Sequence, residues 1–289
     1  ESGRAEYVLG NHEIHLISVC DELRNIVSRP EDSKIDLLRG ALWIAKLDNS
    51  ELNIDSYLQT IDSMAKAVRK RIKPTMEPSE KLATLDRYLF RENGYHGSRT
   101  DYYHEANSHL DRVIDDREGL PITLSVLYIS LAQRLDLKVV GVGLPGHFVV
   151  RHEPPGKAPQ LIDVFDRGQR LSQNQANVLA FRMAGRPPVD DDFKAATHRS
   201  ILIRMLTNLF GVAQSKQEPE ATLRYLEGLV AVVPESDRDL FRLRGQRAVL
   251  RHQQGRKRAA VEDLDWILEQ QPEGLDLSPI RSMREMFAK

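Results

Sequence analysis

A histidine and an aspartate, each beside a short apolar run, are the residues of this chain best suited to chemistry. His147 begins the run His-Phe-Val-Val, and Asp163 ends the run Leu-Ile-Asp after a turn rich in proline. Such runs predict paired strands, and in that hairpin His147 and Asp163 lie near the same end. We therefore expect an imidazole–carboxylate hydrogen bond, the arrangement that orients a general base. The structural alternative is a turn histidine, with Asp163 capping the loop at residues 166–168.

A general base acts on a nucleophile, and the chain has two candidates. Ser125 lies in the apolar stretch before the strands, where a helical hydroxyl usually bonds to its own backbone. Cys20, the single cysteine, falls within an apolar helical pattern and is expected to be a buried core thiol. A hydrolase that combines Ser125 with His147 and Asp163, or that uses metal-bound water, stays open as the alternative function.

The pair must be positioned by one helix and three strands. Apolar side chains recur at helical spacing and around most of the circumference of residues 121–135, which predicts a buried helix. Pro121 suits the first turn of that helix, where its missing N–H would have been unpaired in any case. The predicted strands are residues 138–144, 147–151 and 160–164.

The rest of the chain is predicted to be helical. The predicted helices are residues 11–28, 34–46, 54–71, 80–91 and 169–183, with a linker at residues 185–190. Residues 221–230 align without gaps with residues 259–268, and Pro234 corresponds to Pro272, an offset of 38 residues. This repeat is typical of paired helical hairpins. The second hairpin is rich in arginine, which favours an acidic surface as its partner.

Composition limits the class of protein. The 289 residues suffice for two or three compact units, and Lys plus Arg (41) nearly balance Asp plus Glu (42). Because the chain has no strong overall field and its basic segment has no regularly interleaved aromatic residues, we do not expect nucleic acid as a partner. No apolar run is long enough for a membrane span, and the single cysteine fits a cytoplasmic protein. We expect no cofactor and no metal.

Five short motifs, in order, resemble the SirB-type transglutaminase-like family. They are Asn107-Ser-x-Leu, Arg117-x-Gly-x-Pro-Ile-Thr-Leu-Ser-Val-Leu-Tyr128, Ala132-x-Arg-Leu135, Pro145-Gly-His-Phe148 and Leu161-Ile-Asp163. The resemblance implies a bacterial α+β protein, mostly helical, with a transglutaminase-like (papain-like) core. Its implied domains are a helical N-terminal region (1–94), the core (95–188) and tetratricopeptide-like helical repeats (195–289).

The same resemblance places the family's catalytic residues on this chain. Active members carry Gly-x-Cys at the start of the central helix, and here Gly119-Leu120 leads to Pro121. The family's histidine and aspartate fall on His147 and Asp163. We therefore expect a non-catalytic module for protein interaction or regulation. It would bind a protein or peptide through the repeats and the core cleft. A hydrolase or acyl-transfer enzyme built on the His147 and Asp163 pair is the alternative.

Overall fold

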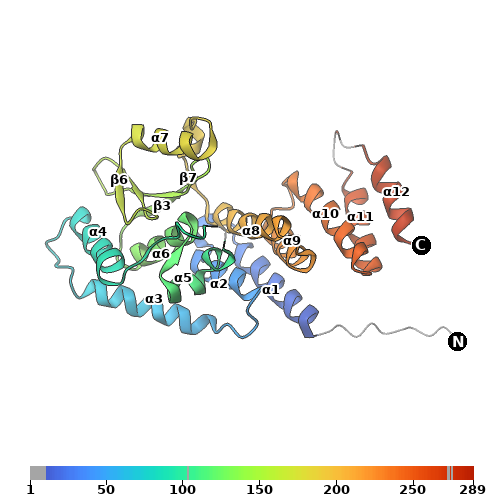
Figure 1. The fold of residues 1–289 in the computed structure, drawn as a ribbon, viewed down its shortest axis with the longest axis horizontal. Coiled ribbons are helices and arrows are strands. Elements are labelled where there is room, and N and C mark those ends of the chain that lie inside the picture. The colour runs from blue at the N-terminus through green and yellow to red at the C-terminus, as the bar shows by residue number, and fades with distance from the viewer. Residues whose placement is uncertain (1–10, 103, 272–273, 275) are drawn as a thin grey trace. The chain divides into compact units, whose positions relative to one another are not determined.

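The structure is a computed structural model that describes residues 11–102, 104–271, 274 and 276–289 (Figure 1). The chain folds into two compact units. The core unit consists of Ile26–Met205. The terminal unit combines Glu1–Asn25 with Leu206–Lys289.

Helices make up the first half of the core unit, as the sequence predicts. Asp36 and Asn53 cap two of them, because their side chains accept backbone N–H groups at 3.0 and 3.1 Å. The helix predicted at residues 80–91 continues as a π-helix in its second half. These elements are η1 (Asp32–Lys34), α2 (Leu37–Lys46), α3 (Ile54–Arg69), α4 (Pro78–Asp86), the π-helix η2 (Arg87–Glu92), η3 (Glu105–Ser108) and α5 (Leu110–Asp116).

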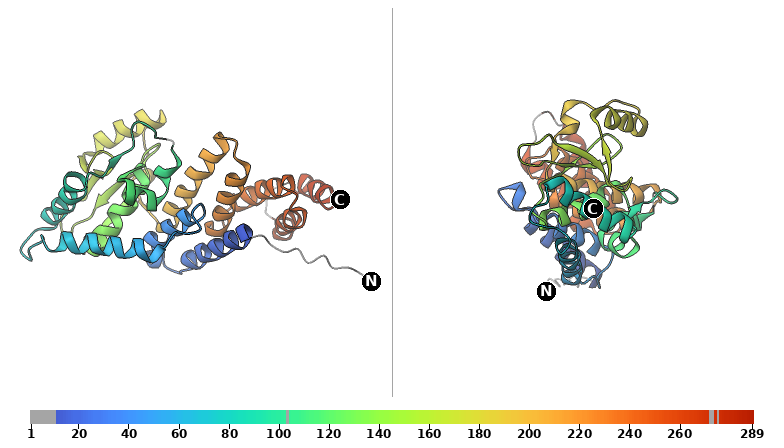
Figure 2. Two further views of the ribbon diagram at one scale, coloured as in Figure 1. Left: turned by 60° about the horizontal axis from the view of Figure 1, so that its bottom comes forward. Right: turned by 90° about the vertical axis from the view of Figure 1, so that its left-hand side faces the viewer.

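Helix α6 (Pro121–Arg134) is the buried helix of the core unit, which confirms the prediction from its all-round apolar pattern. Every residue from Pro121 to Ala132 is buried. The one phenol among them is satisfied, because the Tyr128 hydroxyl donates to Asp86 Oδ1 at 2.7 Å. Figure 2 shows α3 running along α6 on the side away from the sheet.

An antiparallel sheet of five strands lies between α6 and a later helix, α7 (Gln173–Ala184), so the core unit has three layers (Figures 1 and 2). Val149 and Leu161 pack towards Ala176 and Ala180 of α7. The strand order is β6-β5-β4-β3-β7. The strands are β3 (Val139–Val142), β4 (Val149–His152), β5 (Gln160–Asp163), β6 (Gln169–Leu171) and β7 (Ala195–Ala196).

The sheet differs from the prediction at three places. Residues 169–171 form strand β6 paired with β5, so the helix expected from residue 169 begins only at Gln173. Residues Ala195–Ala196 add a fifth strand beside β3. His147 lies in the turn before β4 and not in the strand itself. Between α7 and β7 the chain forms a short 3-10 helix, η4 (Asp190–Phe193).

A short parallel pair of strands, β1 (His96–Gly97) and β2 (Glu118–Gly119), leads into α6. The loop after β1 is fastened to the start of that helix, because the carbonyl of Asn107 accepts from Leu120 N at 3.1 Å and from Thr123 Oγ1 at 2.7 Å. This connection fixes where the loop lies relative to α6.

Successive helices build the terminal unit. The repeated positions share one role, since Leu226 and Leu264 are both fully buried, as are their neighbours Leu229 and Ile267 to within a few per cent. A last helix, absent from the prediction, adds Phe287 to the core cluster that contains Leu264 and Ile267. The helices are α1 (Asn11–Val27), α8 (His198–Ser215), α9 (Pro219–Val232), α10 (Asp239–Gln253), α11 (Lys257–Gln270) and α12 (Ser278–Phe287), of which α1 and α8 extend into the core unit.

Candidate functional site

The turn that carries His147 is fixed by its backbone. The N–H of His147 donates to the carbonyl of Leu144 at 3.1 Å. Nη2 of Arg204 donates to the carbonyls of both His147 and Leu144, at 2.8 and 3.2 Å. Gly146 has φ +67°, a left-handed backbone that glycine adopts without strain. These contacts fix the backbone that carries the imidazole, independently of the hydrogen bond made by the ring.

Asp163, the last residue of β5, holds the imidazole. Its Oδ2 lies 3.1 Å from Nε2 of His147, and both residues are 4% exposed. Its Oδ1 accepts from the N–H groups of Phe165 and Asp166 at 3.0 and 3.3 Å. The two interpretations of Asp163 thus hold together, since one carboxylate contacts His147 and also caps the following loop.

This geometry assigns different roles to the two ring nitrogens of His147. A carboxylate only accepts hydrogen bonds, so Nε2 carries the proton and Nδ1 keeps a lone pair when the ring is neutral. Nδ1 is buried and has no hydrogen-bond partner among the described residues. Phe165 packs against the ring edge to face, with centroids 6.0 Å apart. The pair is therefore oriented as a general base would be.

A cavity of about 640 Å³, which we call the His147 cleft, lies beside the pair. The loop after β1, the β5–β6 loop and one side of α7 form its walls. Two apolar side chains of α7 that line it, Val178 and Met183, are about half exposed (50% and 48%). Helical periodicity predicts α7 but does not indicate which of its apolar side chains remain uncovered, so this wall was not predicted. The lining includes Arg99, Tyr102, His147, Asp163, Phe165 and Asp166.

Neither hydroxyl near the start of α6 reaches the His147 cleft. Ser125 is fully buried and its Oγ donates to the carbonyl of Pro121 at 2.7 Å. Thr123 is equally buried and bonds to Asn107. Pro121 itself occupies the first position of the helix. The described residues that line the cleft include no Cys, Ser or Thr.

Cys20 is a buried thiol in α1, as predicted. It is 7% exposed. Burial, followed by the nearby Glu227 carboxylate, raises the pKa of Cys20 from its usual value to about 12. Because the thiolate is the reactive form of cysteine, this thiol is inert near neutral pH.

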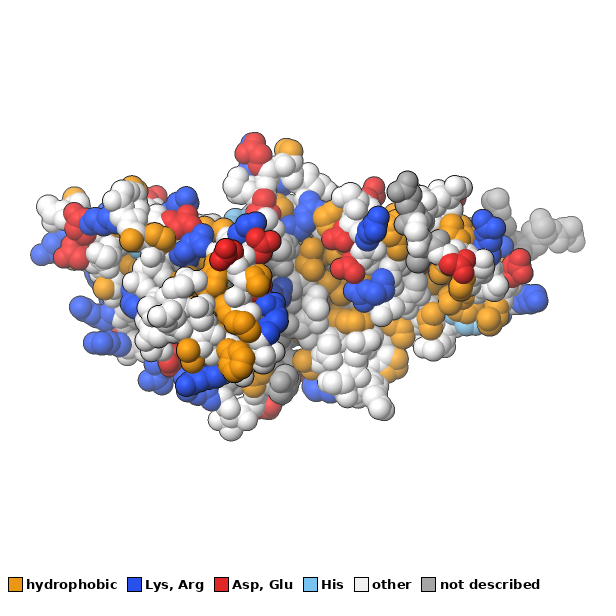
Figure 3. Space-filling view, turned by 90° about the horizontal axis from the view of Figure 1, so that it is seen from above, with side chains coloured by type: hydrophobic (Ala, Val, Ile, Leu, Met, Phe, Trp, Pro, Cys, Tyr) orange, Lys and Arg blue, Asp and Glu red, His pale blue; other side chains and the backbone are white. Residues whose placement is uncertain are grey.

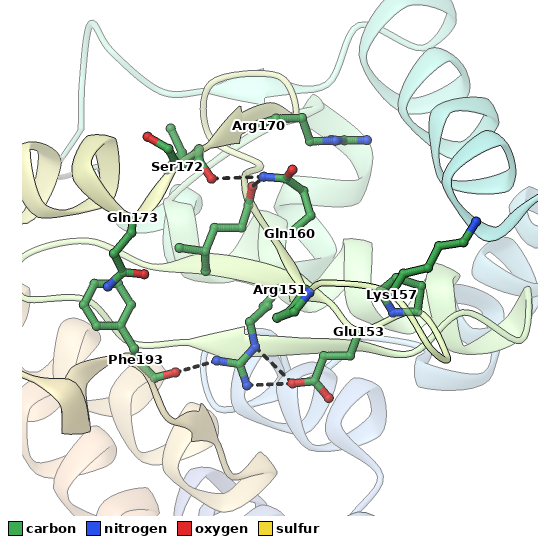
Figure 4. Close-up of a pocket in the computed structure, with 12 residues that line it drawn as sticks. Arg151, Glu153, Lys157, Gln160, Arg170, Ser172, Gln173 and Phe193 are labelled. Carbon is green, nitrogen blue, oxygen red and sulfur yellow. Dashed lines mark hydrogen bonds and ion pairs between the residues drawn. The ribbon is translucent and has the colours of Figure 1, made fainter.

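A larger cavity, of about 750 Å³, lies between the β4–β5 turn and the start of α7 (Figure 4). Three cations line it, and each is engaged by a carboxylate of the chain. The pairs are Arg151 with Glu153, Lys157 with Glu77, and Arg170 with Asp86. Figure 4 shows the Arg151 guanidinium turned towards Glu153 and the carbonyl of Phe193. With its charges paired internally, this cavity is a weaker candidate than the His147 cleft.

Two further classes of site find no support in the described part of the chain. Within it, no three His, Cys, Asp or Glu side chains gather as they would around a metal ion. The helices found there all fall short of the length and apolar character that crossing a membrane requires.

Comparison with known proteins identifies one family and several similar proteins. Residues 55–207 match the family described as the transglutaminase-like superfamily. A UPF0162 protein of Xylella fastidiosa is 30% identical over 264 residues, which cover 90% of this chain and 92% of the relative. The UPF0162 protein YchA of Escherichia coli is 28% identical over 219 residues, 75% of this chain and 78% of YchA. Human F-box only protein 21 is 23% identical over 225 residues, 68% of this chain but 35% of that protein. No solved structure matches the chain.

Proposed function

The chain belongs to the transglutaminase-like superfamily, and from that premise we propose that it is a non-catalytic member that binds a protein or peptide in the His147 cleft. The observation that carries the proposal is the lining of the cleft. Its described residues offer a base, His147, but no Cys, Ser or Thr for that base to activate. Pro121 stands where the family resemblance places the nucleophilic cysteine.

Shape and surface chemistry support a binding role. A volume of about 640 Å³ lies within the range of pockets that enclose small ligands or peptide side chains. Val178 and Met183 line the cleft, and Phe181, on the same helix, is 56% exposed. Figure 3, seen from the side on which α7 lies, shows hydrophobic side chains exposed among charged ones. Because uncovered apolar side chains beside a cavity favour a partner that covers them, the favoured ligand is a peptide segment with apolar side chains.

Three finer assignments belong to the same proposal. We place the chain in the SirB-type branch of the superfamily and interpret α8 to α11 as tetratricopeptide-like hairpins. The functional division then follows the domains expected from sequence, with regions 1–94, 95–188 and 195–289. A cytoplasmic regulatory or adaptor role fits this architecture.

A displayed peptide library tests the proposal. Peptides retained by the full chain are synthesised, and their affinity is measured by fluorescence anisotropy. Val178→Asp and Met183→Asp should each weaken binding about tenfold or more, because a charge is placed on the apolar wall. Val189→Asp is the control, since Val189 is also exposed (59%) but does not line the cleft. Equal affinity in all three variants, or retention of no peptide, would refute the proposal.

The alternative is a hydrolase or acyl-transfer enzyme that uses the His147 and Asp163 pair with a hydroxyl nucleophile or metal-bound water. The intact hydrogen bond and the unpartnered Nδ1 of His147 favour it. Its test is covalent labelling by fluorophosphonate and epoxide probes, repeated on His147→Ala. Labelling of Ser125 or another described residue that disappears in the variant would establish this alternative and exclude the non-catalytic assignment.

A further inference from the structure

An ion-pair network lies inside the terminal unit, and we call it the arginine network. At its centre, Arg247 of α10 donates to Asp263 of α11 through Nε at 2.8 Å and Nη2 at 2.5 Å. Its Nη1 donates to Glu227 of α9 at 2.7 Å. Arg251 joins the same two carboxylates at 2.6 and 2.9 Å. The network therefore connects three helices.

The acids of this network come from neighbouring helices, so they could not be found from the arginine-rich hairpin alone. That hairpin's own sequence shows only Asp237 and Asp239 between residues 237 and 258. In the folded unit, three of its arginines find carboxylates on α9 and α11. The acidic surface expected for this hairpin is thus supplied in part by the chain itself.

The arginine network carries one uncompensated positive charge. Among the described residues, Arg244, Arg247 and Arg251 form ion pairs with two carboxylates, Glu227 and Asp263. The three other carboxylates that line the same cavity are each paired with an arginine outside the network, and one of those arginines, Arg258, is not part of the lining. Those pairs are Glu13 with Arg256, Asp21 with Arg24, and Glu262 with Arg258.

Arg244 is the member whose hydrogen-bonding capacity is least used. Its Nη1 donates to Asp263 Oδ1 at 3.1 Å, whereas its Nε is buried without a partner among the described residues. The guanidinium stacks on the Trp266 ring, 4.0 Å from the centroid, so its plane is fixed. Burial, and then the charge of Arg247, lower the pKa of Arg244. A fixed, partly desolvated guanidinium with free N–H groups is suited to receive an anion.

A cavity of about 440 Å³ opens onto this group. Arg244, Arg247 and Asp263 belong to its lining, and α1 contributes Leu16 and Ile17 on another side. Ile17 is 46% exposed, so the cavity joins a floor of arginines and carboxylates, with Arg244 among them, to an uncovered apolar wall. A ligand that fits both must carry a negative group beside an apolar side chain.

We propose that this cavity binds the carboxylate of a peptide, with Arg244 as the receiving group and the neighbouring apolar side chain of the peptide against Ile17. One carboxylate balances the single excess charge of the arginine network, whereas a phosphate dianion would exceed it. The carboxylate can belong to an acidic side chain or to a peptide C-terminus. This site lies wholly in the terminal unit, so the inference does not depend on the function proposed for the His147 cleft.

Four unlabelled, N-acetylated peptides test the inference by isothermal titration calorimetry on the full chain, because a fluorescein label would itself add a carboxylate. They share the sequence Gly-Ser-Leu-Ile-Glu-Leu and combine Glu or Gln at the fifth position with a free or amidated C-terminus. The peptide with Gln and an amide carries no carboxylate and should bind at least about tenfold more weakly than the tightest of the other three. The Glu-amide and Gln-acid peptides show which carboxylate is recognised. Equal binding of all four, or binding of none, would overturn the proposal.

Arg244→Gln supplies the matched variant, and Arg258→Gln the control. Arg258 is 95% exposed in its side chain and pairs with Glu262 one turn along the same helix. Affinity for the carboxylate peptides should fall about tenfold to a hundredfold in Arg244→Gln and stay unchanged in Arg258→Gln.

A purely structural role for Arg244 predicts a different result. The variant loses the hydrogen bond to Asp263 and the stacking on Trp266, so the melting temperature should fall slightly under either role, and only the binding role predicts weaker peptide affinity. A lower melting temperature with unchanged peptide affinity would refute the inference. Arg244→Lys, which keeps the charge but loses the planar fork, should bind with intermediate affinity.

Discussion

At the scale of single residues, the Asp163 carboxylate both orients an imidazole and caps a loop, and this predicts a measurable cost of replacing it. Asn at position 163 can satisfy the N–H groups of Phe165 and Asp166 only by turning its amide N–H₂ towards the N–H of His147. Asp163→Asn should therefore lower the free energy of unfolding by about 1–3 kcal/mol, measured by urea denaturation.

Asp166→Asn is the control for that measurement. Asp166 is close in sequence, but its side chain is 47% exposed and its ion pair with Arg99 lies in solvent. Its replacement should change the free energy of unfolding by no more than about 0.5 kcal/mol. If both variants lost the same stability, the buried hydrogen bond would not be the cause.

The single thiol gives a prediction that depends on pH. Its folded pKa is raised to about 12, so the folded state favours the protonated thiol. The resulting stabilisation is complete below the unfolded pKa of about 8.5 and is lost as pH rises through the folded value. Native Cys20 should consequently react with iodoacetamide at pH 8 at least about a hundredfold more slowly than in the urea-unfolded chain. Mass spectrometry follows the reaction, and similar rates in both states would show that the thiol is accessible and ionised.

At the scale of elements, the β3–β4 turn and the end of α7 are packed together, so one methyl group between them should be costly. A Cβ at Gly146 would lie 2.8 Å from Cβ and 3.0 Å from the backbone of Met183. Gly156 has nearly the same backbone, φ +70° against +67°, with nothing within 4 Å of such a Cβ. Gly156→Ala should thus lower the free energy of unfolding only by the cost of placing alanine in a left-handed backbone conformation, about 1–2 kcal/mol.

Gly146→Ala should lower the free energy of unfolding by about 1–3 kcal/mol more than Gly156→Ala does, because the turn or α7 must move. Thermal unfolding of the two variants measures the difference. The displaced element also forms a wall of the His147 cleft, so peptides that bind there should lose affinity in Gly146→Ala and not in Gly156→Ala. Equal stability losses would indicate that α7 does not press on the turn.

Elements with a local signal were predictable from the sequence, and elements specified by distant contacts were not. The buried helix α6 follows from apolar side chains around its whole circumference. Strand β6 is only three residues, Gln-Arg-Leu, and exists because it pairs with β5. The end of β6 does have a local signal in the sequence, because Ser172 and Gln175 form a capping box that begins α7 at Gln173. The two alanines of β7 carry no strand preference and depend on β3 alone.

The candidate site likewise has one part that was predictable from the sequence and one part that was not. Two apolar runs separated by a proline-rich turn suffice to bring His147 and Asp163 together, because hairpin pairing is local. The walls of the cleft come from segments far away in sequence, such as Arg99 and Val178, and no local pattern specifies their approach. The partners of the arginine network were missed for the same reason, since Glu227 and Asp263 lie on other helices.

At the scale of the whole molecule, the division into two units predicts that damage to one unit stays within it. Asp263 is 1% exposed in its side chain and is bound by three arginines. Asp263→Asn leaves those cations buried with Glu227 as their main counter-charge, and breaking a buried network in this way costs about 3–5 kcal/mol. Hydrogen exchange read by mass spectrometry should show faster exchange in α9, α10 and α11, by about two to four orders of magnitude.

Peptides from Ile26–Met205 should exchange at their wild-type rates in that variant, because every member of the network belongs to the terminal unit. Asp265→Asn is the control on the same helix: Asp265 is 39% exposed and pairs with Arg284, so its loss should leave exchange in both units nearly unchanged. Uniform acceleration along the whole chain in Asp263→Asn would instead mean that the two units unfold as one cooperative body. A chain with a stable core unit and a loosened terminal unit would allow the His147 cleft to be assayed while the carboxylate site of the terminal unit is disabled.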